Sequence, residues 1–93
     1  MRTPHHSLAL VGQQIRALRE AAGLSQEDFA GRIDVDRSYY SHIERGRYNI
    51  TLEMLFRIAQ GLGCEPAELL PLRRQIGQLP PPPKSKGRRT PRK

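Results

Sequence analysis

The chain has 93 residues, of which 37% are hydrophobic, and a formal net charge of +7. A chain of this length can bury one modest core, which argues against an enzyme built around a deep pocket. No apolar run approaches the ~18 residues of a membrane span, and the N-terminus lacks the pattern of a signal peptide. We therefore expect a soluble, cytoplasmic protein, in which the single cysteine, Cys64, is a small buried hydrophobe.

The positive charge is unevenly distributed along the chain. Residues 1–70 contain eight arginines and all nine acidic residues, whereas residues 71–93 contain eight basic residues and no acidic one. The first part is therefore nearly neutral and the second carries the excess. The total charge of residues 1–70 does not indicate nucleic-acid binding, so only the positions of individual basic side chains can indicate it.

The first two predicted helices cover residues 8–22 and 25–33, after a flexible segment at residues 1–7. The first is indicated by apolar residues spaced three and four apart, and Gly23 follows as its C-terminal glycine. Ser25 is a typical N-cap for the second helix, with Asp28 three residues further on. The apolar stripe of the first helix consists of Leu8, Val11, Ile15, Leu18 and Ala22.

Three more short helices are expected. Asp36 is an N-cap for a helix over 37–44, and Thr51 is an N-cap for a helix that ends near residue 62. Pro66 begins a fifth helix, since proline is favoured in the first helical turn. Gly46 and Gly63 end the third and fourth helices. No segment has the pattern of a strand, so residues 8–73 are predicted to form one compact all-α domain of five helices.

Residues 74–93 have a different composition. They contain the proline run 80–83 and the basic sequence KSKGRRTPRK, with few apolar residues to offset the entropy of ordering. We predict a disordered basic tail. It is either a solubilising extension or a segment that contacts DNA phosphates and adds affinity without specificity.

The second and third predicted helices have the proportions of a helix-turn-helix. The sequences GLSQEDFA, DVDRSYYSHIERG and NITLEMLFRIAQGLG resemble the lambda-repressor/Cro-like (XRE) family of bacterial and phage transcription regulators. The resemblance covers residues 12–70. It implies a five-helix DNA-binding domain that acts as a homodimer on double-stranded DNA.

The third helix is the expected recognition helix. Its period places Tyr40 and Ile43 toward the core and a polar set on the other side, where side chains can meet base edges in the major groove. The base-reading candidates are Arg37, Ser38, Ser41 and His42. The phosphate-binding candidates are Gln26, which matches a phosphate-binding glutamine of the family, and Tyr39, Arg45, Arg47 and Asn49. Each of these polar residues is otherwise ordinary solvated surface.

The resemblance also implies an ion pair between Arg19 and Glu44, which we interpret as structural. Three positions depart from the family pattern: Gly31, which can loosen the last turn of the second helix, Asp34 and Tyr40. Asp34 occupies a turn position that usually holds glycine in a left-handed conformation, and Tyr40 replaces a smaller aliphatic residue, so its hydroxyl needs a partner.

The leading hypothesis is a transcription regulator that binds a roughly palindromic operator as a homodimer. Leu69, Leu70 and Leu72 are candidates for the dimer surface or for closing the core. A restriction-modification controller protein and an autoregulating antitoxin are alternatives of the same fold, and a protein-interaction module is an alternative of another class. No metal site, cofactor or set of catalytic residues is indicated.

Overall fold

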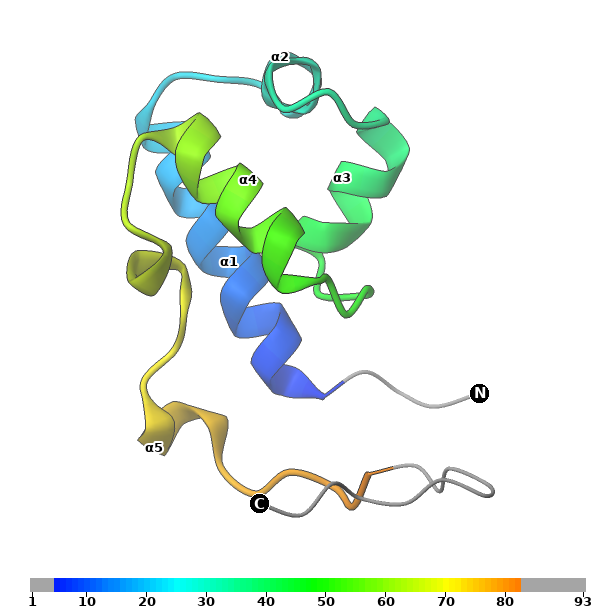
Figure 1. The fold of residues 1–93 in the computed structure, drawn as a ribbon, viewed down its shortest axis with the longest axis vertical. Helices are drawn as coiled ribbons and strands as arrows, with labels where there is room; N and C mark the ends of the chain where they lie inside the picture. Colours follow the sequence, from blue (N-terminus) through cyan, green and yellow to red (C-terminus); the bar gives the residue numbers. More distant parts are fainter. Residues whose placement is uncertain (1–4, 83–93) are drawn as a thin grey trace.

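The computed structural model describes residues 5–82 of the chain. In chain order it contains α1 (His6–Ala21), α2 (Gln26–Arg32), α3 (Arg37–Glu44), α4 (Leu52–Leu62), a 3-10 turn η1 (Pro66–Leu69) and α5 (Arg73–Ile76). No strand occurs within residues 5–82, so the all-α prediction is confirmed. In Figure 1, α4 crosses in front of the long α1, α2 lies at the top and α3 stands to the right. Helix α1 contacts α3, α4, η1 and α5.

The predicted helix starts are confirmed by capping hydrogen bonds from backbone N–H groups in the first turn. Ser25 accepts from Asp28 at 2.9 Å, Asp36 accepts from Ser38 and Tyr39 at 2.9 and 3.2 Å, and Thr51 accepts from Met54 at 3.0 Å. The predicted C-terminal glycines also adopt the left-handed conformation, with φ of 76° at Gly23, 73° at Gly46 and 72° at Gly63. Local capping signals thus set most helix boundaries.

The core lies where α1, α2, α3, α4 and η1 meet. Its two largest side chains, Phe29 and Tyr40, are fully buried, and their ring centroids are 5.3 Å apart. The remaining buried apolar residues come from all five elements and are Ile15, Ala30, Ile33, Ile43, Leu55, Ile58, Ala59 and Leu69.

Helices α1 and α3 approach each other closely enough to touch through their backbones. A Cβ atom at Gly12 would lie 2.3 Å from the backbone carbonyl oxygen of Glu44, far inside van der Waals contact. Gly46, just after α3, approaches Ala9 in the same way, because a Cβ atom there would lie 2.5 Å from the Ala9 Cα. The absence of a Cβ at the two glycines therefore allows α3 to pack this closely against α1.

Both ends of the domain are more ordered than the sequence indicates. Helix α1 begins at His6, with His5 as its N-cap, so the predicted flexible segment at 1–7 is wrong for residues 5–7. Residues 1–4 lie outside the described residues. The cap is made by His5 Nδ1, which accepts a hydrogen bond from the N–H of Ser7 at 3.1 Å.

The C-terminal segment differs from its prediction in two respects. The expected fifth helix is a single 3-10 turn, and helix α5 extends into a segment that we predicted to be disordered from residue 74. The reason is a pair of long-range hydrogen bonds: His6 Nε2 donates to the Gln75 carbonyl at 3.0 Å and His5 Nε2 to the Gln78 carbonyl at 3.1 Å. The prediction for residues 83–93 lies outside the described residues.

Candidate nucleic-acid interface

Helices α2 and α3 are joined by a tight left-handed turn. Asp34 has φ of 61°, a conformation that aspartate tolerates better than most non-glycine residues. The turn is closed by two backbone hydrogen bonds, from Asp34 N–H to the Gly31 carbonyl at 3.2 Å and from Val35 N–H to the Ala30 carbonyl at 2.9 Å. The aspartate thus adopts the conformation usually supplied by glycine.

Helix α3 divides into a buried and a polar side. Tyr40, Ile43 and Glu44 are buried against α1 and α2. Among the predicted base-reading residues, Arg37 and Ser38 are exposed at the N-terminal end of the helix, while Ser41 and His42 are half-buried one turn further on. The predicted set therefore lies on one helix, but only its first two members are freely accessible.

The buried side of α3 ends in a network centred on Glu44. Arg19, which is 6% exposed, donates from Nε to Glu44 Oε2 at 2.6 Å and from Nη2 to Oε1 at 3.0 Å. The Tyr40 hydroxyl donates to Oε2, and the Gln26 amide donates to Oε1 at 2.9 Å. Arg19 also donates to the Leu24 carbonyl at 2.7 Å. The network joins α1, the α1–α2 turn, α2 and α3.

The network determines the charge state of its members. Burial raises the pKa of Glu44, but the hydrogen bonds from Arg19, Tyr40 and Gln26 outweigh it and hold that pKa below its ordinary value. The hydrogen bond to Glu44 raises the pKa of Arg19, against the opposing effect of burial. Burial and the bond to the carboxylate raise the pKa of Tyr40. The carboxylate is therefore ionised and the phenol neutral at neutral pH.

The network supplies the hydrogen-bond partners of the Tyr40 hydroxyl and the Gln26 amide. The hydroxyl of Tyr40 finds its partner one turn away on the same helix, which is why a tyrosine fits where a smaller side chain is usual. The amide of Gln26, predicted to bind phosphate, is half-buried and already donates to Glu44, so it contributes to holding α3 in place.

An aromatic cluster, formed by Tyr39, His42 and Tyr48, joins one side of α3 to the loop that follows it. The rings of Tyr39 and Tyr48 are stacked, with centroids 5.5 Å apart and an interplanar angle of 27°. The rings of His42 and Tyr48 are 5.1 Å apart and tilted by 54°. Tyr48 was missed in the sequence because it lies in the loop after α3, outside any helical period. The three-residue spacing of Tyr39 and His42 could have indicated that their rings lie on one side of α3, where a third ring can pack on both.

The loop after α3 carries the remaining phosphate-binding candidates. Arg45 is the C-cap of α3, and Arg47 and Asn49 follow it; all three are exposed. The loop is tightly folded, because the Arg47 N–H donates to the His42 carbonyl at 3.0 Å. Its basic side chains therefore lie close to the C-terminal end of α3.

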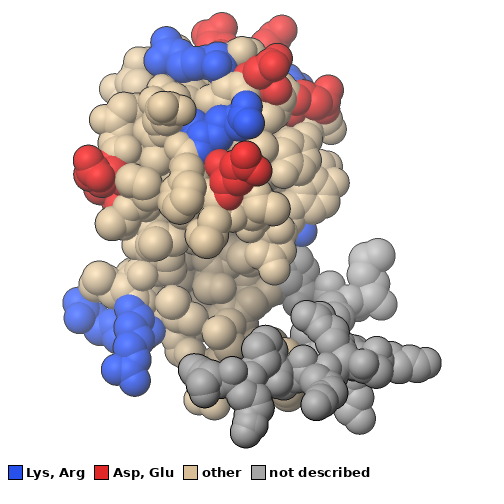
Figure 2. Space-filling view, viewed as in Figure 1, with Lys and Arg blue, Asp and Glu red and all other residues tan. Residues whose placement is uncertain are grey.

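A second surface carries exposed apolar residues on α4 and on the segment after η1. Leu52 and Phe56 are 70% and 51% exposed, and Leu70 and Leu72 are 52% and 53% exposed. Leu69, for which the sequence left the dimer surface and the core as alternatives, is fully buried and closes the core, because η1 packs it between α1 and α4. Figure 2 shows a basic and an acidic group in the middle of this face, and mostly uncharged surface between them and the basic groups at its lower left.

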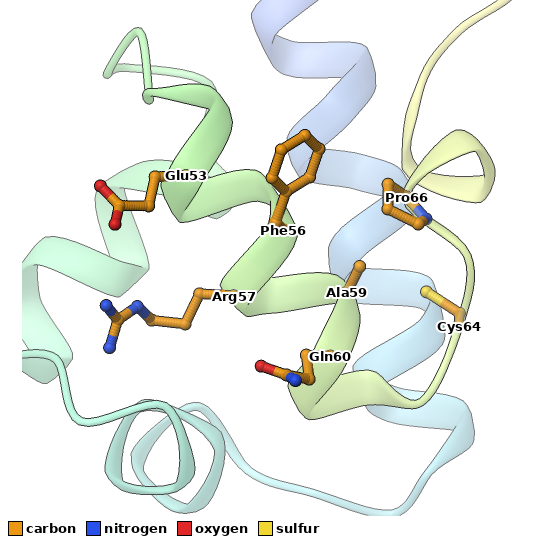
Figure 3. Close-up of a pocket in the computed structure, with 7 residues that line it drawn as sticks. All are labelled: Glu53, Phe56, Arg57, Ala59, Gln60, Cys64 and Pro66. Atoms are coloured by element: carbon orange, nitrogen blue, oxygen red, sulfur yellow. The ribbon is translucent and has the colours of Figure 1, made fainter.

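Two hollows border this apolar surface. One is an apolar groove whose lining includes Leu52, Leu55 and Leu70. The other runs along α4 to the start of η1, and its lining includes Phe56 and Pro66 together with Glu53 and Arg57, which project from α4 away from Pro66 (Figure 3).

Within residues 5–82, no three histidine, cysteine or acidic side chains gather as a metal site. No helix in the same part of the chain is long and apolar enough to cross a membrane.

The left-handed turn, the half-buried α3 and its anchorage to α1 and α2 define a helix-turn-helix domain. The helix-turn-helix family model matches residues 15–69, more than half of the chain, and the chain belongs to that family. The match confirms the resemblance found in the sequence.

Several similar proteins are restriction-modification controllers. The control protein C.MunI from Mycoplasma sp is 49% identical over 59 residues, which cover 62% of this chain and 80% of C.MunI. The structure of the controller protein C.AhdI from Aeromonas hydrophila is 44% identical, with a TM-score of 0.66 over 68% of this chain and 96% of C.AhdI. The controller protein C.Esp1396I, solved as a tetramer in complex with its natural 35 base-pair operator, is 35% identical, with a TM-score of 0.62 over 67% and 82% of the two chains.

Proposed function

We propose that the chain is a cytoplasmic transcription regulator that binds a palindromic operator as a homodimer, with α3 in the major groove. The observation that carries this proposal is the fixed orientation of α3. Its buried side is anchored through Glu44 to Arg19 and Gln26, while Arg37 and Ser38 remain exposed at its N-terminal end. A recognition helix needs this combination of rigid support and free polar side chains near its start.

The two sets of polar residues have separate roles in the proposal. Arg37 has the planar fork that matches the O6 and N7 acceptors of guanine, and Ser38, Ser41 and His42 are less selective base readers. Phosphate contacts come from Tyr39 and the exposed loop side chains Arg45, Arg47 and Asn49. Gln26 keeps its amide hydrogen bond to Glu44 and donates its second amide hydrogen to a phosphate. In a symmetric dimer the two recognition helices lie about 34 Å apart, one turn of the duplex.

The test is selection from random duplexes, followed by footprinting at two salt concentrations, for the wild type and Arg37→Ala. We expect the wild type to enrich a two-fold symmetric site and Arg37→Ala to lose preference at one base pair in each half-site, at a cost of about 1–3 kcal/mol. Weak binding without sequence preference would refute the proposal and favour the protein-interaction module.

Within this class we propose a restriction-modification controller as the particular role. The support is the likeness to three controllers, C.MunI, C.AhdI and C.Esp1396I, each of which this chain matches over most of its length. The test is to identify the neighbouring genes and footprint the DNA upstream of them. Genes for a methyltransferase and an endonuclease, with a bound operator between them, are expected. A neighbouring toxin gene would instead favour the antitoxin.

We further propose that the homodimer forms through the apolar surface of α4 and the segment after η1. Leu70 and Leu72 are retained from the sequence prediction, and the structure adds Leu52 and Phe56. Beside them, Glu53 and Arg57 are exposed and four residues apart, and neither forms an ion pair in the described part of the chain. A two-fold axis across α4 would pair Glu53 of one copy with Arg57 of the other, twice.

Reversing these charges tests the dimer surface. Glu53→Arg or Arg57→Glu alone should weaken the dimer, since like charges then face each other, and the double variant should restore it. Sedimentation without DNA measures the effect. Arg16→Glu, at an exposed site on α1, is the matched control and should leave the dimer intact. If both single variants dimerise like the wild type, this surface is not the interface.

A further inference from the structure

Tyr48 contacts the recognition helix from outside it. Its ring stacks on Tyr39 with a centroid distance of 5.5 Å and packs against His42 at 5.1 Å. Tyr39 and His42 are three residues apart, so they lie on the same side of α3. One loop side chain therefore touches two side chains that the proposed function assigns to DNA contact.

Within residues 5–82, the His42 ring is held by packing and not by hydrogen bonds. Its Nδ1 atom is buried without a hydrogen-bond partner in this part of the chain, which leaves Nε2 as the ring nitrogen that can meet another molecule. A buried polar atom without a partner is costly, so a structure keeps one only where other contacts determine the position of the group. Here those contacts include the ring of Tyr48.

The loop is itself fixed, which allows Tyr48 to act as a support. Backbone hydrogen bonds at 3.0 Å tie Gly46 to Ile43 and Arg47 to His42. Tyr48 is 44% exposed as a residue and borders the apolar groove next to Ile50. It is therefore anchored at the loop and accessible at the surface that would face DNA.

We infer that Tyr48 is a positioning residue that fixes the rings of Tyr39 and His42 before DNA is bound, and so sets operator preference from outside the recognition helix. The inference rests on the proposed function. Stacked and tilted aromatic pairs are favourable, and side chains already held in place lose less entropy on binding. Without Tyr48 both rings would be free to adopt several rotamers, and their contacts with DNA would be less selective.

The test compares Tyr48→Ala and Tyr48→Phe with the wild type by selection from random duplexes and by affinity for single-base variants of the selected site. Tyr48→Phe keeps the ring and should behave like the wild type. Tyr48→Ala should discriminate less between the selected site and its single-base variants, by about 2- to 12-fold in the ratio of affinities for each ring released. This range is the energy of one aromatic pair converted into an equilibrium ratio. Arg47→Ala is the matched control, because removing a phosphate-binding side chain lowers affinity equally for all sequences.

Two further measurements separate positioning from folding. Thermal unfolding should show Tyr48→Ala folded, and nuclear Overhauser contacts between the Tyr39 and Tyr48 rings should be present in the free wild type. Unchanged base preference in Tyr48→Ala would overturn the inference. Equal impairment of Tyr48→Phe would also overturn it, since the hydroxyl would then be acting on DNA directly. A wild type that enriches no site would refute the proposed function, and the positioning role with it.

Discussion

Replacing Glu44 with alanine would remove the acceptor of four hydrogen bonds at once. Two come from Arg19, one from the Tyr40 hydroxyl and one from the Gln26 amide. Arg19 would remain as a buried cation without its partner, since only 6% of the residue is exposed. The perturbation therefore lies at the junction of α1, α2 and α3, and its cost comes chiefly from the charge that is left behind.

The expected decrease in stability is large for a domain of this size. Removing one partner of a buried ion pair costs about 3–5 kcal/mol. A domain of under 100 residues has a total free energy of unfolding of roughly 5–15 kcal/mol, and each kcal/mol lowers its melting temperature by about 4–8 °C. Glu44→Ala should therefore lower the melting temperature by about 12–40 °C, or leave the domain unfolded at ambient temperature.

Thermal and urea unfolding followed by circular dichroism at pH 7 would measure this decrease. Arg16→Ala is the matched control: it removes a guanidinium that pairs with Glu20 at 3.0 Å, but both side chains are more than half exposed, so the cost should stay below about 1 kcal/mol. Adding Arg19→Met to Glu44→Ala should recover part of the stability, because no unpaired charge is then buried. If Glu44→Ala costs no more than Arg16→Ala, the network is not what holds α3.

Three other predictions concern acid, packing and salt. The folded pKa of Glu44 lies below its ordinary 4.5, so the ionised carboxylate stabilises the domain fully above pH 4.5 and loses this effect as the pH falls through the folded pKa. The melting temperature of Glu44→Gln should therefore fall less with acid than that of the wild type, and parallel pH curves would contradict this. Gly12→Ala should destabilise the domain, since its Cβ would lie 2.3 Å from the carbonyl oxygen of Glu44. Gly31→Ala, whose Cβ would meet no atom of the described residues within 4 Å, should stabilise it by about 0.5–1 kcal/mol. Calorimetry distinguishes the two variants, and equal effects would refute the close approach of the two backbones. Deleting residues 84–93 should reduce the salt dependence of DNA binding by about 0.9 in log–log slope for each phosphate that the tail neutralises, without changing sequence preference; an unchanged slope would show that the tail neutralises none.

Helix boundaries were predictable where a local signal sets them. Ser25, Asp36 and Thr51 cap their helices as predicted, because the capping hydrogen bond is made within three residues of the cap. Gly63 ends α4 with a left-handed φ for the same local reason. The core side of α3 was also predictable, since the helical period alone places Tyr40 and Ile43 together.

What could not be predicted depends on interactions between distant parts of the chain. Helix α5 carries no apolar period and is held by imidazoles that are about 70 residues away in sequence. Leu69 and Leu70 are adjacent and chemically identical, yet one is buried and the other half-exposed, which follows only from how η1 packs on α1 and α4. Tyr48 lies in a loop, where no period indicates which way a side chain points.

The histidine bonds that join the start of α1 to α5 have a consequence for local unfolding. His5 and His6 cap or begin one helix while holding the carbonyls of Gln78 and Gln75, so the two ends of the described chain are stabilised together. The first turn of α1 and the segment after η1 contribute no buried side chain to the core, whose first member from α1 is Ile15. The first turn of α1 and the C-terminal arm should therefore open as one unit with a small free energy, and their amide hydrogens should exchange together while those of α3 and the Glu44 network stay protected.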